Sequence, residues 1–72
     1  MQTRQKEIRF TLRAARLING LTQKQASKAL GVCVNTLSSY ENDESYPDVM
    51  ILKRMEKLYG IRYDQMLFPK LY

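Results

Sequence analysis

Three glycines divide this chain into short amphipathic segments, and this division most constrains its fold. In the first segment the apolar residues Ile8, Leu12 and Ala15 recur at spacings of four and three, which is typical of one face of a helix. Gly20 follows this segment and can adopt the left-handed conformation that commonly ends a helix. Because Gly31 follows closely, the second helix must be short. The sequence therefore predicts a bundle of short helices.

We expect a compact all-α bundle of five helices with no sheet. Thr22 and Gln25 have the spacing of a capping box at the start of the second helix. Asp48 suits the positive N-terminal end of the fourth helix, and Pro69 ends the fifth. The expected helices span about Gln5–Ile18, Thr22–Leu30, Val34–Glu41, Asp48–Tyr59 and Tyr63–Phe68. The expected core contains Leu12, Ala15, Leu21, Ala26, Leu30, Val32, Leu37, Leu52, Met55, Leu58 and Ile61.

Length and composition exclude several classes of protein. A chain of 72 residues predicts one domain over 1–72, with its core over about 6–68. With Cys33 as its only cysteine and no histidine, we expect no internal disulfide, no metal, no cofactor and no catalytic triad. A free thiol fits a reducing cytoplasm, and no run approaches the roughly 20 apolar residues of a membrane span. The N-terminus has no apolar signal region, so we expect the mature protein to begin at Met1.

The net charge of +5 suits nucleic acid, an anionic membrane surface or an acidic partner. Charge alone does not choose among these, but the basic residues are concentrated in the first part of the chain. They are Arg4, Lys6, Arg9, Arg13, Arg16, Lys24 and Lys28.

The third predicted helix has a polar but uncharged outer face. A helix that only meets solvent usually carries Lys and Glu there, whereas this one carries Val34, Asn35, Ser38 and Ser39. Such short side chains can reach base edges in the major groove of DNA. Asn35 could bind adenine through two hydrogen bonds, and Val34 could contact a thymine methyl group. The alternative is that both are ordinary exposed helix residues.

This part of the chain resembles the lambda-repressor and Cro-like helix-turn-helix family, from about Ile8 to Leu67. The residues that carry the resemblance are Gly20-Leu21-Thr22-Gln23, Gly31-Val32, Thr36-Leu37, Tyr40-Glu41-Asn42 and Pro47. The resemblance implies a five-helix bundle in which the second and third helices form the DNA-reading unit.

The resemblance also implies roles for individual residues. Val34, Asn35 and Ser39 occupy base-reading positions, with Ser38 as a further candidate. Arg16 and Glu41 match an ion pair that aims the arginine toward a phosphate, although an exposed pair would contribute little. Gln23 is expected to brace the recognition helix as well as to contact phosphate. The expected phosphate contacts are Gln23, Arg16, Thr36 and Asn42.

Five positions depart from the family pattern. Ser27 stands where the tight contact between the two helices usually has alanine, and Cys33 replaces the usual Ser or Thr cap, which leaves a poor acceptor. Asp43 and Glu44 stand in a loop that usually carries glycine and often lysine. Two carboxylates there would be repelled by phosphates. Arg62 replaces a Ser or Thr cap, so we expect a frayed fifth helix.

These observations favour a transcriptional regulator, similar to repressors and Cro proteins of phages and mobile elements. It would occupy an operator of double-stranded DNA as a homodimer, on half-sites about 34 Å apart, without contacting a membrane. The alternative is a protein-interaction module, of the antitoxin or anti-repressor type. An enzyme or an RNA-binding protein is disfavoured.

Two questions stay open at this point. A redox role for Cys33 is conceivable, although a small residue tolerated at a cap explains it more simply. The C-terminal third, from Gly60 to Tyr72, is the best candidate dimer surface. Its apolar residues could form a dimer contact or complete the monomer core; they are Tyr63, Met66, Leu67, Phe68, Leu71 and Tyr72.

Overall fold

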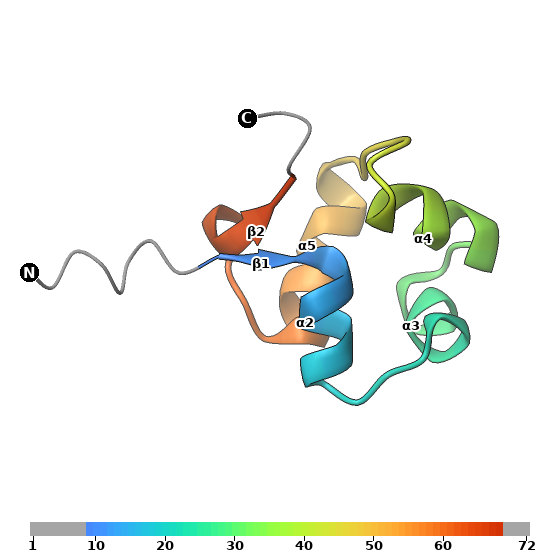
Figure 1. Cartoon of the computed structure of the whole chain (residues 1–72), viewed down its shortest axis with the longest axis horizontal. Helices are drawn as coiled ribbons and strands as arrows, with labels where there is room; N and C mark the ends of the chain where they lie inside the picture. Colours follow the sequence, from blue (N-terminus) through green and yellow to red (C-terminus); the bar gives the residue numbers. More distant parts are fainter. Residues whose placement is uncertain (1–8, 69–72) are drawn as a thin grey trace, which may run out of the picture.

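The computed structural model describes residues 9–68 as four α-helices, one short 3₁₀ helix and two very short strands (Figure 1). The elements are β1 (Phe10–Thr11), α2 (Leu12–Ile18), α3 (Gln23–Leu30), α4 (Val34–Glu41), α5 (Val49–Tyr59), η1 (Tyr63–Gln65) and β2 (Met66–Leu67). The strands and η1 lie at one side of the molecule, and α3 and α4 lie at the other. Within the described part of the chain, no helix is long and apolar enough to cross a membrane.

Three of the helices begin at a side chain that accepts a hydrogen bond from the first helical turn. Thr11 accepts from the Ala14 amide at 3.1 Å. Thr22 accepts from the Gln25 amide at 3.1 Å, and the Gln25 side chain accepts from the Thr22 amide at 2.9 Å. Asp48 accepts from the Ile51 amide at 3.0 Å. The capping box at Thr22 is therefore confirmed, and α3, α4 and α5 lie within one residue of their predicted bounds.

The expected helical fold class is confirmed, but the expectation of five α-helices and no sheet is wrong. The first helix begins at Leu12, because Thr11 caps it and Phe10–Thr11 is extended. These two residues pair in parallel with Met66–Leu67. The predicted fifth helix over Tyr63–Phe68 is only the 3₁₀ turn η1, after which the backbone is extended. Met66 and Phe68 are both buried at a spacing of two, which suits a strand better than a helix. The part of the first predicted helix before residue 9, including Ile8, lies outside the described residues.

The core lies between α2, α3, α4, α5 and the C-terminal strand. Its buried residues are Leu12, Ala15, Ala26, Leu30, Leu37, Met55, Tyr59, Met66 and Phe68. The other predicted core residues pack against this cluster and are partly buried; they are Leu21, Val32, Leu52, Leu58 and Ile61. The sequence prediction omitted Tyr59 and left the C-terminal residues open. Met66 and Phe68 complete the monomer core, while Tyr63 is exposed, and Leu71 and Tyr72 lie outside the described residues.

Candidate nucleic-acid interface

The pair α3 and α4 is joined by a turn of three residues, Gly31 to Cys33. Gly31 has a φ of 79°, and a Cβ atom there would lie 3.0 Å from Nη1 of Arg54. That nitrogen donates to the Leu30 carbonyl oxygen at 2.9 Å, so Arg54 of α5 caps the C-terminal end of α3. The turn therefore favours glycine for its left-handed backbone conformation, and any Cβ atom there would also crowd the Arg54 guanidinium.

Ser27 is the residue that the family resemblance places at the tight helix–helix contact. It is buried, and its hydroxyl donates to the Lys24 carbonyl oxygen at 3.0 Å. Because the polar group finds its partner within its own helix, serine fits here without an unpaired hydroxyl.

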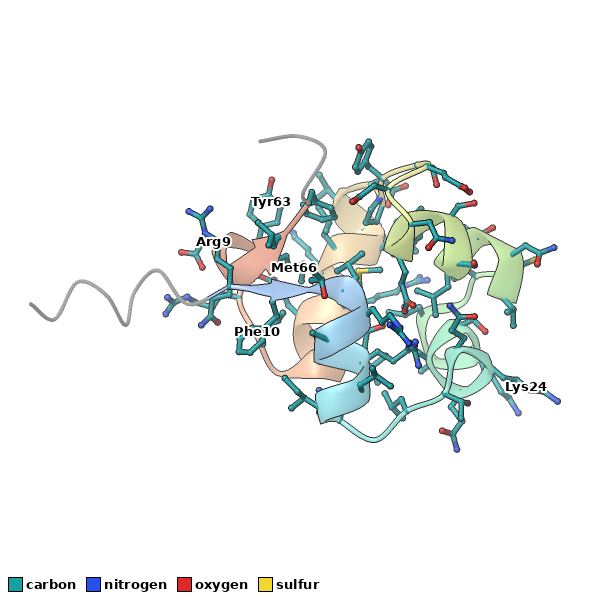
Figure 2. All side chains as sticks on the ribbon, in the orientation of Figure 1. Arg9, Phe10, Lys24, Tyr63 and Met66 are labelled. Atoms are coloured by element: carbon teal, nitrogen blue, oxygen red, sulfur yellow. The ribbon has the colours of Figure 1, made fainter. Side chains whose placement is uncertain are left out.

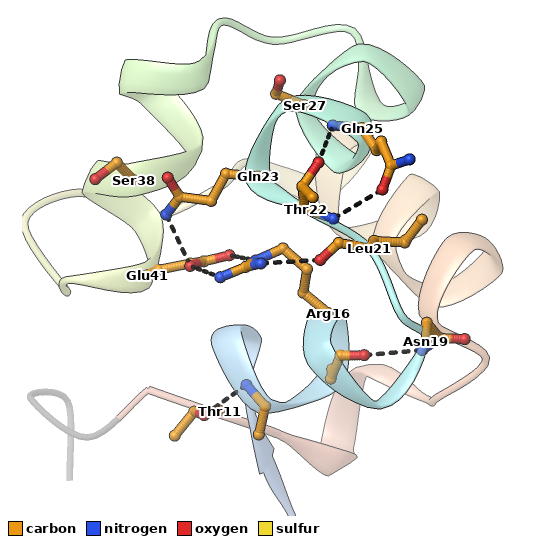
Figure 3. A network of polar contacts seen from close by, with 12 residues as sticks. Thr11, Arg16, Asn19, Leu21, Thr22, Gln23, Gln25, Ser27, Ser38 and Glu41 are labelled. Atoms are coloured by element: carbon orange, nitrogen blue, oxygen red, sulfur yellow. Dashed lines mark hydrogen bonds and ion pairs between the residues drawn. The ribbon is translucent and has the colours of Figure 1, made fainter.

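A buried polar network joins α2, α3 and the C-terminal end of α4 (Figure 3). Arg16 donates to both carboxylate oxygens of Glu41, from Nε at 2.7 Å and from Nη2 at 3.1 Å. Its Nη1 donates to the Leu21 carbonyl oxygen at 2.9 Å. Gln23 also donates to Glu41, at 3.0 Å. Four hydrogen bonds therefore fix the position of α4 against the two preceding helices.

Burial decides what this ion pair does. The side chains of Arg16 and Glu41 are only 8% and 2% exposed, so this is not the exposed pair that would contribute little. The hydrogen bond with Glu41 raises the pKa of Arg16, despite the opposing effect of burial. Since so little of the guanidinium faces solvent, the geometry favours a bracing role for Arg16 over the expected phosphate contact.

The opposite face of α4 is open to solvent. Val34 is 40% exposed and Asn35 is also exposed, whereas Leu37 on the inner face is fully buried. Ser38 and Ser39 are partly exposed one turn later. Asn42 follows the helix and is exposed, with its amide 3.4 Å from the Ser38 hydroxyl. The four expected base-reading residues therefore lie on α4 with side chains that are partly or fully accessible, and Thr36 is partly buried between them.

Known proteins match this chain in sequence. A helix-turn-helix family model matches residues 12–66, which is more than half of the chain. This chain belongs to the Cro- and CI-type helix-turn-helix family. The HTH-type transcriptional regulator ImmR of Bacillus subtilis (strain 168) is 39% identical over 56 residues, which cover 78% of this chain and 44% of ImmR. The chain thus spans less than half the length of that relative. No solved structure gives a significant match.

In this helix-turn-helix domain, charge is distributed unevenly around the recognition helix. Lys24 and Lys28 are exposed on α3, and Figure 2 shows Lys24 pointing away from the β1–β2 end of the molecule. From Gly31 to Leu52, by contrast, the sequence has no lysine or arginine. The same stretch carries acidic residues at Glu41, Asp43, Glu44 and Asp48. Electrostatic attraction to phosphate would therefore come from the α3 side rather than from the loop after α4.

Asp43 lies in the loop after α4, which in the family usually carries glycine. Its φ is 60°, in the left-handed region that glycine adopts most readily. Asn and Asp tolerate this conformation better than other residues that carry a side chain. The departure from the family pattern therefore leaves some strain in this loop, together with a negative charge next to the recognition helix.

Two structural residues escaped the sequence analysis. Arg54 caps α3 through a contact that leaves no local pattern in the sequence. Tyr59 is 3% exposed, and its hydroxyl has no hydrogen-bond partner within residues 9–68. Burial, together with a smaller effect of the nearby Glu41 carboxylate, raises the pKa of Tyr59 to about 12, while Arg16 opposes the shift. The spacing of four between Met55 and Tyr59 could have identified the tyrosine as a core residue.

Proposed function

We propose that this domain binds double-stranded DNA by inserting the outer face of α4 into the major groove. The observation that carries the proposal is the combination of two features of α4. Its outer face is accessible, polar and neutral, and a buried network holds its C-terminal end in place through Glu41. A reading helix needs both, because hydrogen bonds to base edges require side chains held in a defined position.

The proposed contacts follow from position and exposure. Val34, Asn35, Ser38 and Ser39 face the bases. Gln23, Thr36 and Asn42 face the phosphates, and Gln23 also braces α4 through Glu41. Arg16 acts mainly by holding Glu41 and so the C-terminal end of α4.

We further propose that the protein regulates transcription by occupying an operator. ImmR carries that general role in its name. One recognition helix covers few base pairs, so two copies on half-sites about 34 Å apart would supply the specificity that a genome demands. The exposed part of the C-terminal third, which includes Tyr63, is the proposed contact between copies. Met66 and Phe68 are not available for it, because they are buried within the monomer.

The test is selection of bound duplexes from a random pool, followed by affinity measurements over a range of salt concentrations. We expect one enriched motif with two-fold symmetry, and an affinity that falls as salt rises. Enrichment of an asymmetric motif would reject the dimer but keep the DNA-binding function. Failure of the folded protein to bind any duplex at low salt would reject the DNA-binding function.

A second candidate is a protein-interaction module, and one observation favours it. Val49 and Met50 are 66% and 61% exposed at the start of α5, immediately after the acidic loop. A module of this kind would bind protein with no salt-dependent affinity for duplex DNA, so the same titration separates the two candidates.

A further inference from the structure

We infer that α4 selects A·T base pairs at the positions it reads, and that it reads no guanine. This inference rests on the proposed DNA-binding function and specifies the DNA that the site prefers. It depends on the side chains that α4 exposes. It also depends on the absence of lysine and arginine from α4 and on the burial of its one acidic residue.

The first step concerns guanine. The commonest specific contact in the major groove joins Arg or Lys to O6 and N7 of guanine. No lysine or arginine occurs from Gly31 to Leu52, which covers the turn, the whole of α4 and the loop that follows. Lys24 lies on α3, and the first helix of such a motif crosses the DNA backbone rather than entering the groove. The described residues therefore provide no guanine reader on the recognition helix.

The second step concerns cytosine, which is read by a carboxylate that accepts from its amino group. Glu41 is the acidic residue within α4. Its side chain is 2% exposed, and both carboxylate oxygens accept hydrogen bonds from Arg16, with Gln23 also bound to Oε1. Glu41 therefore cannot reach a base without breaking the network that fixes the helix.

The third step concerns the two selective side chains that remain. Val34 is apolar and exposed, which suits contact with the C5-methyl group of thymine. Asn35 is exposed beside it. Its Nδ2 can donate to N7 of adenine while its Oδ1 accepts from the N6 amino group, which matches the paired donor and acceptor pattern that adenine presents. Both lie in the first turn of α4, the part of a recognition helix that contacts base edges. The hydroxyl groups of Ser38 and Ser39 both donate and accept, so they add contacts without preferring a base.

Base analogues test this inference on the motif obtained by selection with the full chain. Deoxyuridine in place of thymine removes the methyl group, and we expect about a 4-fold loss of affinity at one thymine. 7-Deazaadenine removes the N7 acceptor, and replacing the contacted adenine should cost roughly 2- to 13-fold, because one of the two paired hydrogen bonds is lost. Val34→Ala should become insensitive to the uracil change, and Asn35→Ala should become insensitive to the 7-deazaadenine change. Ser38→Ala is the matched control on the same face and should retain both sensitivities.

A gain of specificity completes the test. Asn35→Arg should transfer the preference at its base pair from adenine to guanine, because arginine forms the paired bonds to O6 and N7. The inference is overturned if the selected motif has G·C at a position whose preference changes in Val34→Ala or Asn35→Ala. It is also overturned if both variants keep the sensitivities of the parent protein. In either case duplex binding and the proposed function stand, whereas absence of any duplex binding rejects both.

Discussion

The two ends of α4 are built in opposite ways. At the C-terminal end, Glu41 is buried and bound by Arg16 and Gln23. At the N-terminal end, Cys33 is exposed and makes no side-chain hydrogen bond to the first turn, and the exposed Val34 and Asn35 follow it. One end of the helix therefore supplies rigidity and the other supplies an accessible surface. The difference predicts that stability and the proposed DNA recognition are separable along a helix of eight residues.

Breaking the buried end should have the largest effect on stability. Arg16→Ala leaves Glu41 buried without its partner, and Glu41→Ala does the same to Arg16. Removing one partner of a buried pair costs about 3–5 kcal/mol. Because a domain of this size rarely has more than about 5 kcal/mol to lose, both variants should be largely unfolded at 25 °C in circular dichroism and urea denaturation.

A double replacement sharpens this prediction. Arg16→Met combined with Glu41→Leu removes both charges and retains apolar volume, so it should be more stable than either single variant. A double variant that is as unstable as the sum of the single ones would show that the two residues act independently.

The tyrosine beside this network should make stability sensitive to alkaline pH. The pKa of Tyr59 is raised to about 12 in the folded state from 10.0, so the unfolded chain loses the phenolic proton first as pH rises. The free energy of unfolding should therefore fall between pH 10 and 12, by roughly 2 kcal/mol.

Tyr59→Phe is the matched control, since it removes the titrating hydroxyl and leaves the ring. Its stability near pH 7 should equal or exceed that of the parent, because the buried hydroxyl has no partner within residues 9–68. Parallel pH profiles of the two proteins above pH 10 would show that other groups cause the alkaline loss.

The N-terminal end of α4 can be stabilised by a substitution, whereas the changes at the C-terminal end destabilise the domain. Cys33→Ser places a hydroxyl acceptor at the N-cap, and we expect a gain of about 1 kcal/mol in the free energy of unfolding. Cys33→Ala provides no acceptor and should show no such gain in the same urea titration. Equal stability of the two variants would mean that α4 does not need a cap at this end.

The smallest expected effect is at Asp43, just beyond α4. Asp43→Gly should relieve the strain of the left-handed backbone conformation at this position. We expect it to stabilise the domain by a few tenths of a kcal/mol to about 1 kcal/mol. Asp43→Asn keeps a residue that tolerates this conformation but removes the charge. If repulsion from phosphate matters here, both variants should bind duplex DNA more tightly than the parent, while an unchanged affinity would place the loop away from the backbone.

Local chemistry explains which parts of the fold the sequence could predict. Thr22 with Gln25, Asp48 and Gly31 act within one turn of their own positions, so α3, α4 and α5 were predicted within one residue. The sheet was missed because two-residue strands have almost no pattern, and Phe10 finds Met66 only through tertiary packing. The start of α2 was within reach of the sequence, because Thr11 is a preferred N-cap residue and accepts from the Ala14 amide.

The sequence also predicts the site only in part. The polarity of the outer face of α4 can be read directly from Val34, Asn35 and the serines. The pairing of Arg16 with Glu41 came only from resemblance to a family, because hydrogen bonds between distant helices leave no spacing to detect. The cap of Arg54 on Leu30 has no sequence signature at all, and it emerged only with the structure.

The central claim is that α4 reads DNA through the exposed side chains at its N-terminal end. Asn35→Ala tests this claim most directly. The measurement is the affinity of folded parent and folded variant for the selected duplex and for a scrambled duplex of equal length, at the same salt concentration. We predict a loss of roughly 5- to 150-fold on the selected duplex and no change on the scrambled one, because the substitution removes base contacts but no charge. Equal affinities of parent and variant on the selected duplex, or an equal loss on both duplexes, would contradict the claim.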